Sequence, residues 1–343
     1  MGGGAVRQTR IVAMKALVTG GGGFLGRHIV AKLLARGDTV RVLGRRPYPD
    51  LQKMGVETVR ADLQDAAAVE RACHGIDTVF HVGALAGYWG SWRTFYGPNV
   101  VGTQNVLSGC RTAGARKLIY TSTPSVVSAP GGLENADERV PYPAKYECSY
   151  PATKARAERL VLRANNLEGL QTVSIRPHLI FGPGDPHLFP RIIERAKRGQ
   201  LIQVGEGLNK VDVVYVENAA DAHLLAADRL CEGSPVAGQA YFISQGAPVM
   251  LWAWINLILE RLSLPGVRRK LSHGMARVVG AALEMAYTVL PFQGEPRMTR
   301  FLADQLATSH YFDISKARKH LGYEPRINTE EGLERTLKAL KIA

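Results

Sequence analysis

The chain has 343 residues, 46% hydrophobic and 21% charged, which is the composition of a globular protein with a sizeable core. Its formal charge of +13 favours anionic small ligands over nucleic acid, because the Lys and Arg residues are dispersed, with no long run and no interleaved aromatic residues. Cys73, Cys110, Cys148 and Cys231 form no C-x-x-C pair, which argues against a metal site or a disulfide framework and favours a reduced, cytoplasmic location. Residues 1–13 contain no apolar signal segment, so we expect a disordered extension.

A glycine-rich turn follows the first predicted strand. The apolar run at 16–18 has strand character, residues 19–26 read TGGGGFLG, and residues 27–34 carry apolar side chains at the spacing of one helical face. Gly20 permits a tight turn, Gly23 lets a pyrophosphate approach the backbone, and Gly26 allows helix and strand to pack closely. Although an ordinary glycine loop is the alternative, this strand-turn-helix context predicts dinucleotide binding at the helix N-terminus.

The end of the second predicted strand, at 39–43, indicates which dinucleotide is bound. Rossmann units that bind NAD usually carry an acidic residue at this point to hold the ribose 2′-hydroxyl. Here the sequence is Gly44-Arg45-Arg46. Guanidinium groups pair with a 2′-phosphate, so the sequence predicts NADPH rather than NADH; the alternative is that both Arg residues are plain surface residues.

Strands continue to alternate with helices up to Pro177, which predicts an α/β fold with a doubly wound parallel Rossmann sheet. Beyond Pro177 strands and helices no longer alternate regularly, and this change indicates a smaller substrate-binding lobe. We therefore expect an NADP-binding domain at 14–177 and, at 178–343, mainly a substrate-binding lobe interleaved with it. The further strands are expected at 56–61, 77–82, 117–121, 172–176, 201–204, 211–216 and 240–243, and the helices at 65–73, 100–113, 152–166, 188–198 and 219–230.

Two groups of polar residues could carry chemistry. Tyr150 and Lys154 are four residues apart, so they share one face of a helix. A neighbouring ammonium group stabilises a phenolate and brings a Tyr closer to acid–base work at neutral pH. Residues 120–125 (YTSTPS) end the fifth strand, where ligands of open α/β sheets bind. A hydroxyl there would polarise a substrate carbonyl, or it would simply cap the strand.

A long apolar stretch spans Met275 to Phe292, interrupted by Arg277 and Glu284. It is too short and too charged to predict a membrane span. We expect instead a buried amphipathic helix, or one that touches a lipid-like substrate. Its residues Val278, Val279, Ala282, Leu283, Ala286, Val289 and Leu290 would then line an apolar channel or belong to the core.

Taken together, these motifs resemble the extended branch of the short-chain dehydrogenase/reductase superfamily, from Lys15 to the end of the chain. The resemblance also rests on Asp62-Leu63, His81–Ala84, Asn99 with Gly102 and Thr103, 176–184 and 313–325. It implies an active-site Tyr150 and Lys154, with Thr123 where the family usually has Ser; Ser122 or Ser125 are the alternatives. The cofactor contacts that it implies, beside Arg45 and Arg46, are Gly20, Gly23, Phe24, Leu25, Gly26, Asp62, Leu63, Ala84, Ser122, Tyr150, Lys154, Pro177 and Ile180.

Within that branch the chain is similar to the 3-beta-hydroxysteroid dehydrogenase-like group, through residues 176–187, Val211-Asp212, Tyr215-Val216 and Asn218. In that group it most resembles the bacterial reductases of long-chain 2-alkyl-3-oxoalkanoic acids in olefin biosynthesis. The resemblance implies reduction of a 3-ketone by NADPH, a homodimer, and membership of a multi-enzyme assembly. A cation should meet the substrate carboxylate, and His187, Arg191 and Arg93 are candidates.

Other functions remain open at this point. A 3-beta-hydroxysteroid or sterol dehydrogenase is the second enzyme hypothesis, disfavoured by Arg45 and Arg46 because oxidative enzymes more often use NAD. A nucleotide-sugar epimerase would share the fold, but the apolar later part of the chain suits a lipid better. A sensor or scaffold that binds NADPH without turnover would not need Tyr150, Lys154 and Thr123.

Overall fold

A computed structural model describes residues 13–290, 292 and 294–342. The extension predicted at 1–13 therefore lies outside the described residues, apart from Ala13. A seven-stranded sheet in the order β12-β7-β5-β4-β1-β2-β3 forms the larger part of the molecule, and all of its strand pairs are parallel. Its strands are β1 (Lys15–Thr19), β2 (Thr39–Gly44), β3 (Glu57–Arg60), β4 (Thr78–His81), β5 (Lys117–Thr121), β7 (Gln171–Pro177) and β12 (Gln239–Ile243).

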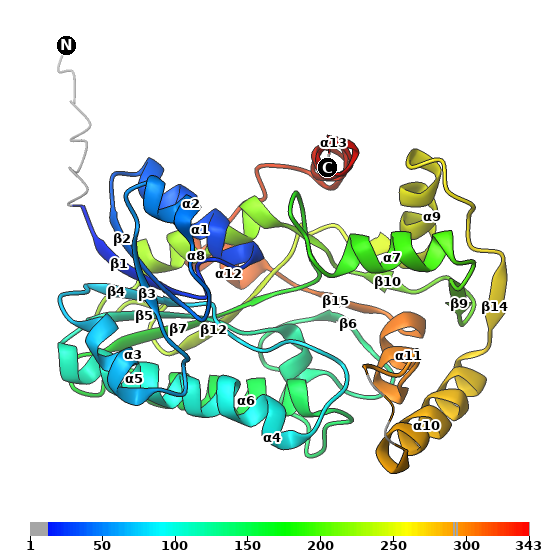
Figure 1. Cartoon of the computed structure of the whole chain (residues 1–343), viewed down its shortest axis with the longest axis horizontal. Helices are drawn as coiled ribbons and strands as arrows, with labels where there is room; N and C mark the ends of the chain where they lie inside the picture. Colours follow the sequence, from blue (N-terminus) through cyan, green and yellow to red (C-terminus); the bar gives the residue numbers. More distant parts are fainter. Residues whose placement is uncertain (1–12, 291, 293, 343) are drawn as a thin grey trace.

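Helices cover both faces of this sheet (Figure 1). Its central strands are buried on both sides, as parallel strands between two helical layers must be. One apolar core lies under α1 (Phe24–Ala35) and α8 (Val216–Arg229), and a second lies under α3 (Ala66–Cys73), α5 (Gly102–Ala113) and α6 (Ser149–Arg163). The predicted α/β doubly wound sheet is confirmed.

The second core brings together residues that are far apart in the sequence. Cys73 on α3 and Cys110 on α5 are both buried in this core. The seventh strand, β12, comes from beyond Pro177 and pairs with β7. Chain order alone therefore does not separate the sheet from the rest of the molecule.

The smaller lobe is built around a four-stranded sheet in the order β13-β10-β15-β6, with two further strand pairs, β11 with β8 and β14 with β9. Its strands are β6 (Leu133–Ala136), β8 (Ile180–Phe181), β9 (Ile202–Val204), β10 (Lys210–Val211), β11 (Val214–Tyr215), β13 (Val249–Met250), β14 (Arg269–Leu271) and β15 (His310–Phe312). The other helices are α2 (Pro49–Lys53), α4 (Trp92–Tyr96), α7 (Leu188–Lys197), α9 (Leu251–Arg261), α10 (His273–Val289), α11 (Arg300–Ala307), α12 (Ser315–Leu321) and α13 (Thr329–Ile342), with short turns of other helix types at Gly97–Val101 and Pro124–Val127.

The strand predicted at 211–216 is wrong as a single element. Val211 pairs with His310 in one sheet, whereas Val214 pairs with Ile180 in another. Between them the Asp212 carboxylate accepts a hydrogen bond from the Phe312 amide at 2.8 Å, which fixes the crossing from one sheet to the next. Val216 already begins α8.

The interpretation of 275–292 as a buried helix or a channel lining is also wrong. Most of this stretch forms α10, in which only Ala276 and Gly280 are buried. Val278 is 64% exposed and Val289 is 75% exposed, so these side chains form an open surface. No helix among the described residues is long and apolar enough to cross a membrane.

Candidate active site

The glycine turn between β1 and α1 is held by close backbone contacts. Gly20 has a φ of +67°, and a Cβ atom there would lie 2.7 Å from the Gly83 Cα atom. The Gly23 amide donates a hydrogen bond to the Gly20 carbonyl at 2.9 Å, and Gly26 packs directly on that same carbonyl. Gly23 itself is exposed at the N-cap of α1, followed by Phe24 and Leu25 in its first turn. The turn thus presents bare backbone at a helix N-terminus, the arrangement that accepts phosphate groups.

Beside this turn, the end of β2 carries two exposed guanidinium groups. Arg45 and Arg46 take part in no ion pair among the described residues. The Tyr48 ring packs against Gly22 and Gly44, and so joins the glycine turn to the segment that carries both Arg residues. Two unpaired cations therefore lie next to the predicted phosphate site.

A buried hydrogen-bond network locks the strands under the turn. His81 Nδ1 lies 2.7 Å from the Thr19 hydroxyl, and His81 Nε2 lies 3.0 Å from the Thr103 hydroxyl. The Thr103 hydroxyl donates to the Asn99 carbonyl, so it must accept from Nε2, and His81 is the neutral tautomer protonated there. Burial and the nearby Lys154 lower the pKa of His81 to about 3, in agreement with a neutral ring.

Lys154 lies in the second turn of α6 and is 2% exposed. Its ammonium group donates to the Thr121 carbonyl at 2.6 Å and lies 4.2 Å from the centroid of the Tyr120 ring. Burial lowers the pKa of Lys154 to about 7, and Glu158, one helical turn further along α6, acts in the opposite direction. This ammonium group therefore holds its proton less tightly than that of an exposed Lys.

Glu158 is the other buried charge of α6. It receives two hydrogen bonds from Arg176 on β7, at 2.6 and 3.0 Å, and one from the Ser174 hydroxyl at 2.6 Å. Arg176 lowers the pKa of Glu158 in spite of its burial, so the carboxylate keeps its charge. The pair joins α6 to β7 one helical turn beyond Lys154.

Tyr150 lies in the first turn of α6 and is partly buried. Burial raises the pKa of its phenol, the nearby Tyr88 adds to that rise, and a hydrogen bond with Thr123 opposes it. The expectation that Lys154 lowers the pKa of Tyr150 is therefore wrong for this structure, because burial dominates. Thr123 lies just past the end of β5, where its hydroxyl is 3.1 Å from that of Ser125. The Ser122 hydroxyl is instead buried, with no hydrogen-bond partner among the described residues. The structure thus brings Tyr150 and Thr123 together, and Lys154 lies one turn further along the helix that carries Tyr150.

The remaining predicted cofactor residues lie at the same carboxyl edge of the sheet. Asp62 and Leu63 follow β3, Ala84 follows β4, and Pro177 and Ile180 flank a turn after β7. Leu63 packs against Gly83 and Gly102, and Asn99 holds the loop after β4 through the Leu85 amide at 2.8 Å. In the turn after β7, Leu179 has a positive φ of 40°, which is unusual for a branched residue.

The three candidate partners of a carboxylate differ in their surroundings. Arg93 on α4, His187 and Arg191 are all exposed. Arg191 lies over the Tyr88 ring, 5.6 Å from its centroid, and pairs with Glu295 at 3.0 Å. Because Tyr88 lies near enough to Tyr150 to raise the pKa of its phenol, Arg191 is the candidate that the structure links to Tyr150.

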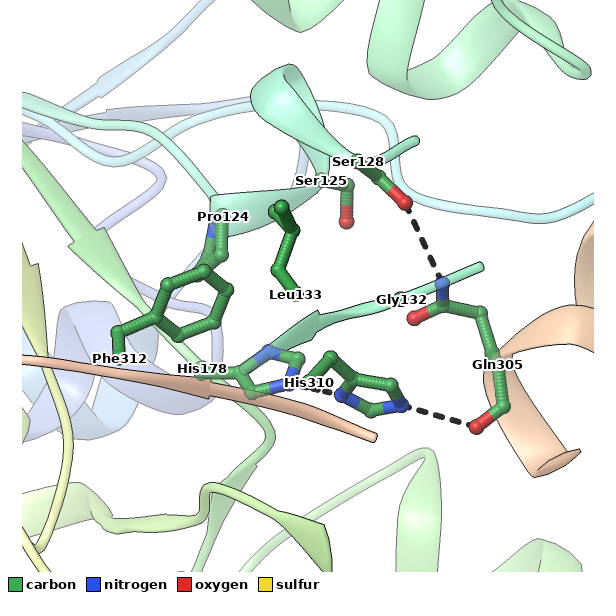
Figure 2. A pocket seen from close by; sticks show the side chains of 9 residues that line it. All are labelled: Pro124, Ser125, Ser128, Gly132, Leu133, His178, Gln305, His310 and Phe312. Carbon is green, nitrogen blue, oxygen red and sulfur yellow. Dashed lines mark hydrogen bonds between the residues drawn. The ribbon is translucent and has the colours of Figure 1, made fainter. Parts of the chain in front are cut away.

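A small pocket adjoins this site, between the ends of β5 and β7 and the smaller lobe (Figure 2). His178 and His310 meet in its wall at 2.6 Å, and His310 donates from Nε2 to the Gln305 carbonyl at 2.9 Å. His310 therefore accepts at Nδ1, and His178 must donate from Nε2. Burial lowers the pKa of both rings, so this His pair joins the two parts of the molecule as a neutral pair.

Sequence reasoning missed Glu158, Tyr88 and His310. Glu158 follows Lys154 by four residues, so helical spacing would have placed it on the same face. Tyr88 lies in an irregular loop and His310 on a short strand of the smaller lobe, and neither has a spacing that points to the site.

The sequence of this chain is similar to those of known enzymes. Residues 17–272 match the 3-beta hydroxysteroid dehydrogenase/isomerase family. A 2-alkyl-3-oxoalkanoate reductase of Stenotrophomonas maltophilia is 48% identical over 333 residues, which cover 96% of this chain and 100% of that protein. The mouse decarboxylating sterol-4-alpha-carboxylate 3-dehydrogenase is 36% identical over 331 residues, covering 95% and 91% of the two chains.

Solved structures show the same architecture. MoeE5, solved with UDP-glucose and NAD, is 26% identical with a TM-score of 0.74, covering 96% of this chain and 99% of that one. The dTDP-glucose 4,6-dehydratase DesIV of Streptomyces venezuelae has a TM-score of 0.76 at 24% identity, covering 96% and 97%, and this likeness shows the fold alone. On the family match and the identity to its relatives, this chain belongs to the 3-beta hydroxysteroid dehydrogenase/isomerase family and is an oxidoreductase of the extended short-chain dehydrogenase/reductase type.

Proposed function

We propose that the protein reduces the 3-ketone of a long-chain 2-alkyl-3-oxoalkanoic acid to the 3-hydroxy acid with NADPH, as a step of olefin biosynthesis. The observation that carries this proposal is the meeting of Tyr150 and Thr123 beside the carboxyl end of β5, with Lys154 one turn along the same helix. The 48% identity over the whole of a reductase with that name supports the substrate class.

The residues present fit a phosphorylated dinucleotide. The Gly20–Gly26 turn offers bare backbone to a pyrophosphate, and Arg45 and Arg46 offer unpaired guanidinium groups to a 2′-phosphate. Phe24, Leu25, Asp62, Leu63, Ala84, Ser122, Pro177 and Ile180 would complete the binding site. When bound, NADPH supplies a hydride to the carbonyl carbon of the substrate.

Tyr150 and Thr123 act on the oxygen of that carbonyl, and Lys154 acts on Tyr150. Tyr150 holds its proton at neutral pH and donates it to the alkoxide that develops as the hydride adds. Lys154 supplies positive charge that stabilises the resulting phenolate. Thr123 donates a hydrogen bond that fixes the carbonyl oxygen before reaction, which is the role of a preorganised donor.

The carboxylate of the substrate would meet Arg191. This side chain lies over Tyr88 at the border of Tyr150, whereas no hydrogen bond or ion pair among the described residues connects Arg93 or His187 to the site. Replacing Arg191 with Ala should raise the KM for the keto acid and leave the KM for NADPH unchanged.

The decisive experiment mixes the purified protein with NADPH or NADH and follows nicotinamide absorbance after a long-chain 2-alkyl-3-oxo acid is added. A 3-beta-hydroxysteroid with NADP⁺ or NAD⁺ runs in parallel, because the 36% identity to a sterol dehydrogenase favours that alternative. We expect NADPH to be oxidised when the keto acid is added, and we expect no turnover of the steroid. Turnover of the steroid alone would replace this proposal with the sterol alternative, and cofactor binding without turnover of either substrate would refute it.

A further inference from the structure

The phenol of Tyr48 lies in a slot between two glycine residues at the edge of the predicted dinucleotide site. A Cβ atom at Gly22 would lie 2.0 Å from a carbon of the Tyr48 ring, and a Cβ atom at Gly44 would lie 2.4 Å from the Tyr48 hydroxyl oxygen. Neither glycine has a positive φ, so the backbone conformation does not require glycine at either position. What the two glycines provide is room for the phenol.

The segment that carries Tyr48 is held in place on both sides. A proline precedes Tyr48 and another follows it, and each proline ring fixes the φ of its own residue. Asp50, in the first turn of α2, pairs with Arg27 of α1, so that α2 lies beside α1 (Figure 1). Arg27 also donates from Nε to the Gly22 carbonyl at 3.1 Å. One guanidinium group thus ties the glycine turn to the segment of Tyr48, and the phenol is positioned before any ligand binds.

The hydroxyl of Tyr48 lies where a side chain at the end of β2 would otherwise project. Gly44 is the last residue of β2. Rossmann proteins that bind NAD usually carry an acidic side chain at this point, and its carboxylate holds the ribose 2′-hydroxyl. Here a side chain on residue 44 would collide with the Tyr48 hydroxyl. Among the described residues no hydrogen bond uses that hydroxyl, and Tyr48 is partly exposed, so the O–H group is free to donate to a ligand.

We propose that Tyr48 is a specificity residue for the phosphorylated cofactor: its hydroxyl donates a hydrogen bond to the 2′-phosphate, and its phenol keeps a carboxylate out of this position. Arg45 and Arg46 follow Gly44 directly and are both exposed. Two guanidinium groups and one hydroxyl are all donors, which suits a phosphate that only accepts. The inference rests on the NADPH dependence proposed above, and it adds to it a residue that carries no charge.

The first test measures the Kd of NADPH and of NADH by titration calorimetry with no substrate present, so that it does not depend on turnover. Tyr48→Phe should raise the Kd of NADPH at least about 10-fold, which is the loss of one hydrogen bond to a charged group. The Kd of NADH should stay nearly unchanged, because NADH has no 2′-phosphate. Tyr311→Phe on β15 is the matched control, since Tyr311 is also partly exposed but lies in the smaller lobe.

The second test exchanges the phenol for the carboxylate that it excludes. Gly44→Asp should raise the Kd of NADPH about 100-fold, because the new carboxylate repels the 2′-phosphate and displaces the Tyr48 hydroxyl. Adding Tyr48→Ala makes room for that carboxylate, so the double variant should bind NADH about 10-fold more tightly than Gly44→Asp alone. Tyr48→Ala by itself should not tighten the binding of NADH. This dependence of one substitution on the other would not arise if Tyr48 only supported the fold.

Circular dichroism and Tm check that every variant folds. An unchanged Kd of NADPH in Tyr48→Phe, or an equal loss in Tyr311→Phe, would overturn this inference and leave the proposed NADPH dependence standing. So would a Tyr48→Ala variant that loses NADPH and NADH equally while Tyr48→Phe loses neither, which would make the ring a stacking partner of the adenine. A wild-type protein that binds NADH more tightly than NADPH would overturn both the inference and the proposed cofactor.

Discussion

Helices α6 and α10 depart from the usual polar-out, apolar-in pattern in opposite directions. Helix α6 buries two charged residues, Lys154 and Glu158, at 2% and 0% exposure. Helix α10 exposes its apolar residues and turns Arg277 and Glu284 toward α11. Both arrangements cost free energy relative to an ordinary amphipathic helix. In α6 the buried Lys154 serves the proposed chemistry, and Glu158 ties the helix to Arg176 on β7.

The largest effect should come from Tyr150 in the first turn of α6. Replacing Tyr150 with Phe should lower kcat by about 10²–10⁴-fold, because the proton donor is lost. Affinity for NADPH, measured by titration calorimetry, should stay nearly unchanged. The control is Tyr311→Phe on β15, which removes a phenol from the smaller lobe. Near-normal turnover of Tyr150→Phe would show that another group donates the proton.

The buried ion pair of α6 should come next. Glu158→Gln leaves Arg176 buried without a charged partner, so we expect the free energy of unfolding in urea to fall by about 3–5 kcal/mol. Glu168→Gln breaks the exposed pair with Arg111 and should leave stability nearly unchanged. An equal loss in the free energy of unfolding of both variants would show that the buried ion pair contributes no more to stability than the exposed one.

Cofactor choice should depend on the end of β2. Arg45→Gln with Arg46→Gln should raise the KM for NADPH about 10–100-fold, which is the loss of hydrogen bonds to a charged group. The KM for NADH should hardly change, since NADH lacks the 2′-phosphate. Arg60→Gln, at the end of neighbouring β3, is the control. An equal rise in the KM for NADPH and for NADH would show that the two guanidinium groups do not contact the 2′-phosphate.

Stability should also vary with pH through Lys154. Its pKa is about 7 in the folded protein against an ordinary value of 10.5, so between these values the unfolded chain holds the proton more tightly. The contribution of Lys154 to the free energy of unfolding should therefore rise with pH across this window, by up to about 1.4 kcal/mol per pH unit. Urea unfolding of Lys154→Met should lack that slope, and Lys53→Met, an exposed control, should keep it.

The smallest effect should come from α10, through a matched pair of substitutions. Val161→Thr buries a hydroxyl in α6, where Val161 is 0% exposed, and should cost about 1–3 kcal/mol. Val278→Thr changes a residue of α10 that is 64% exposed and should shift the free energy of unfolding by less than about 0.5 kcal/mol. Similar losses of stability in both variants would mean that Val278 is covered in the protein in solution.

The sequence by itself determined the sheet and its nucleotide turn. Glycine spacing, buried strand runs and helical periodicity are local signals, so the glycine turn at 19–26, the strands up to 172–176 and the Tyr150–Lys154 pair follow from neighbouring residues alone. Local patterning also identified an apolar helix at 275–292, but it could not assign the direction of its apolar face. Its burial was predicted because apolar residues are usually inside.

Only the tertiary structure decided which distant residues meet. It joined Glu158 to Arg176 and His178 to His310 across different elements, and it split 211–216 between two sheets. It also turned the apolar side chains of α10 outward, because Arg277 and Glu284 pair with residues of α11. These outcomes depend on contacts between segments far apart in the chain, whose energies no local pattern records.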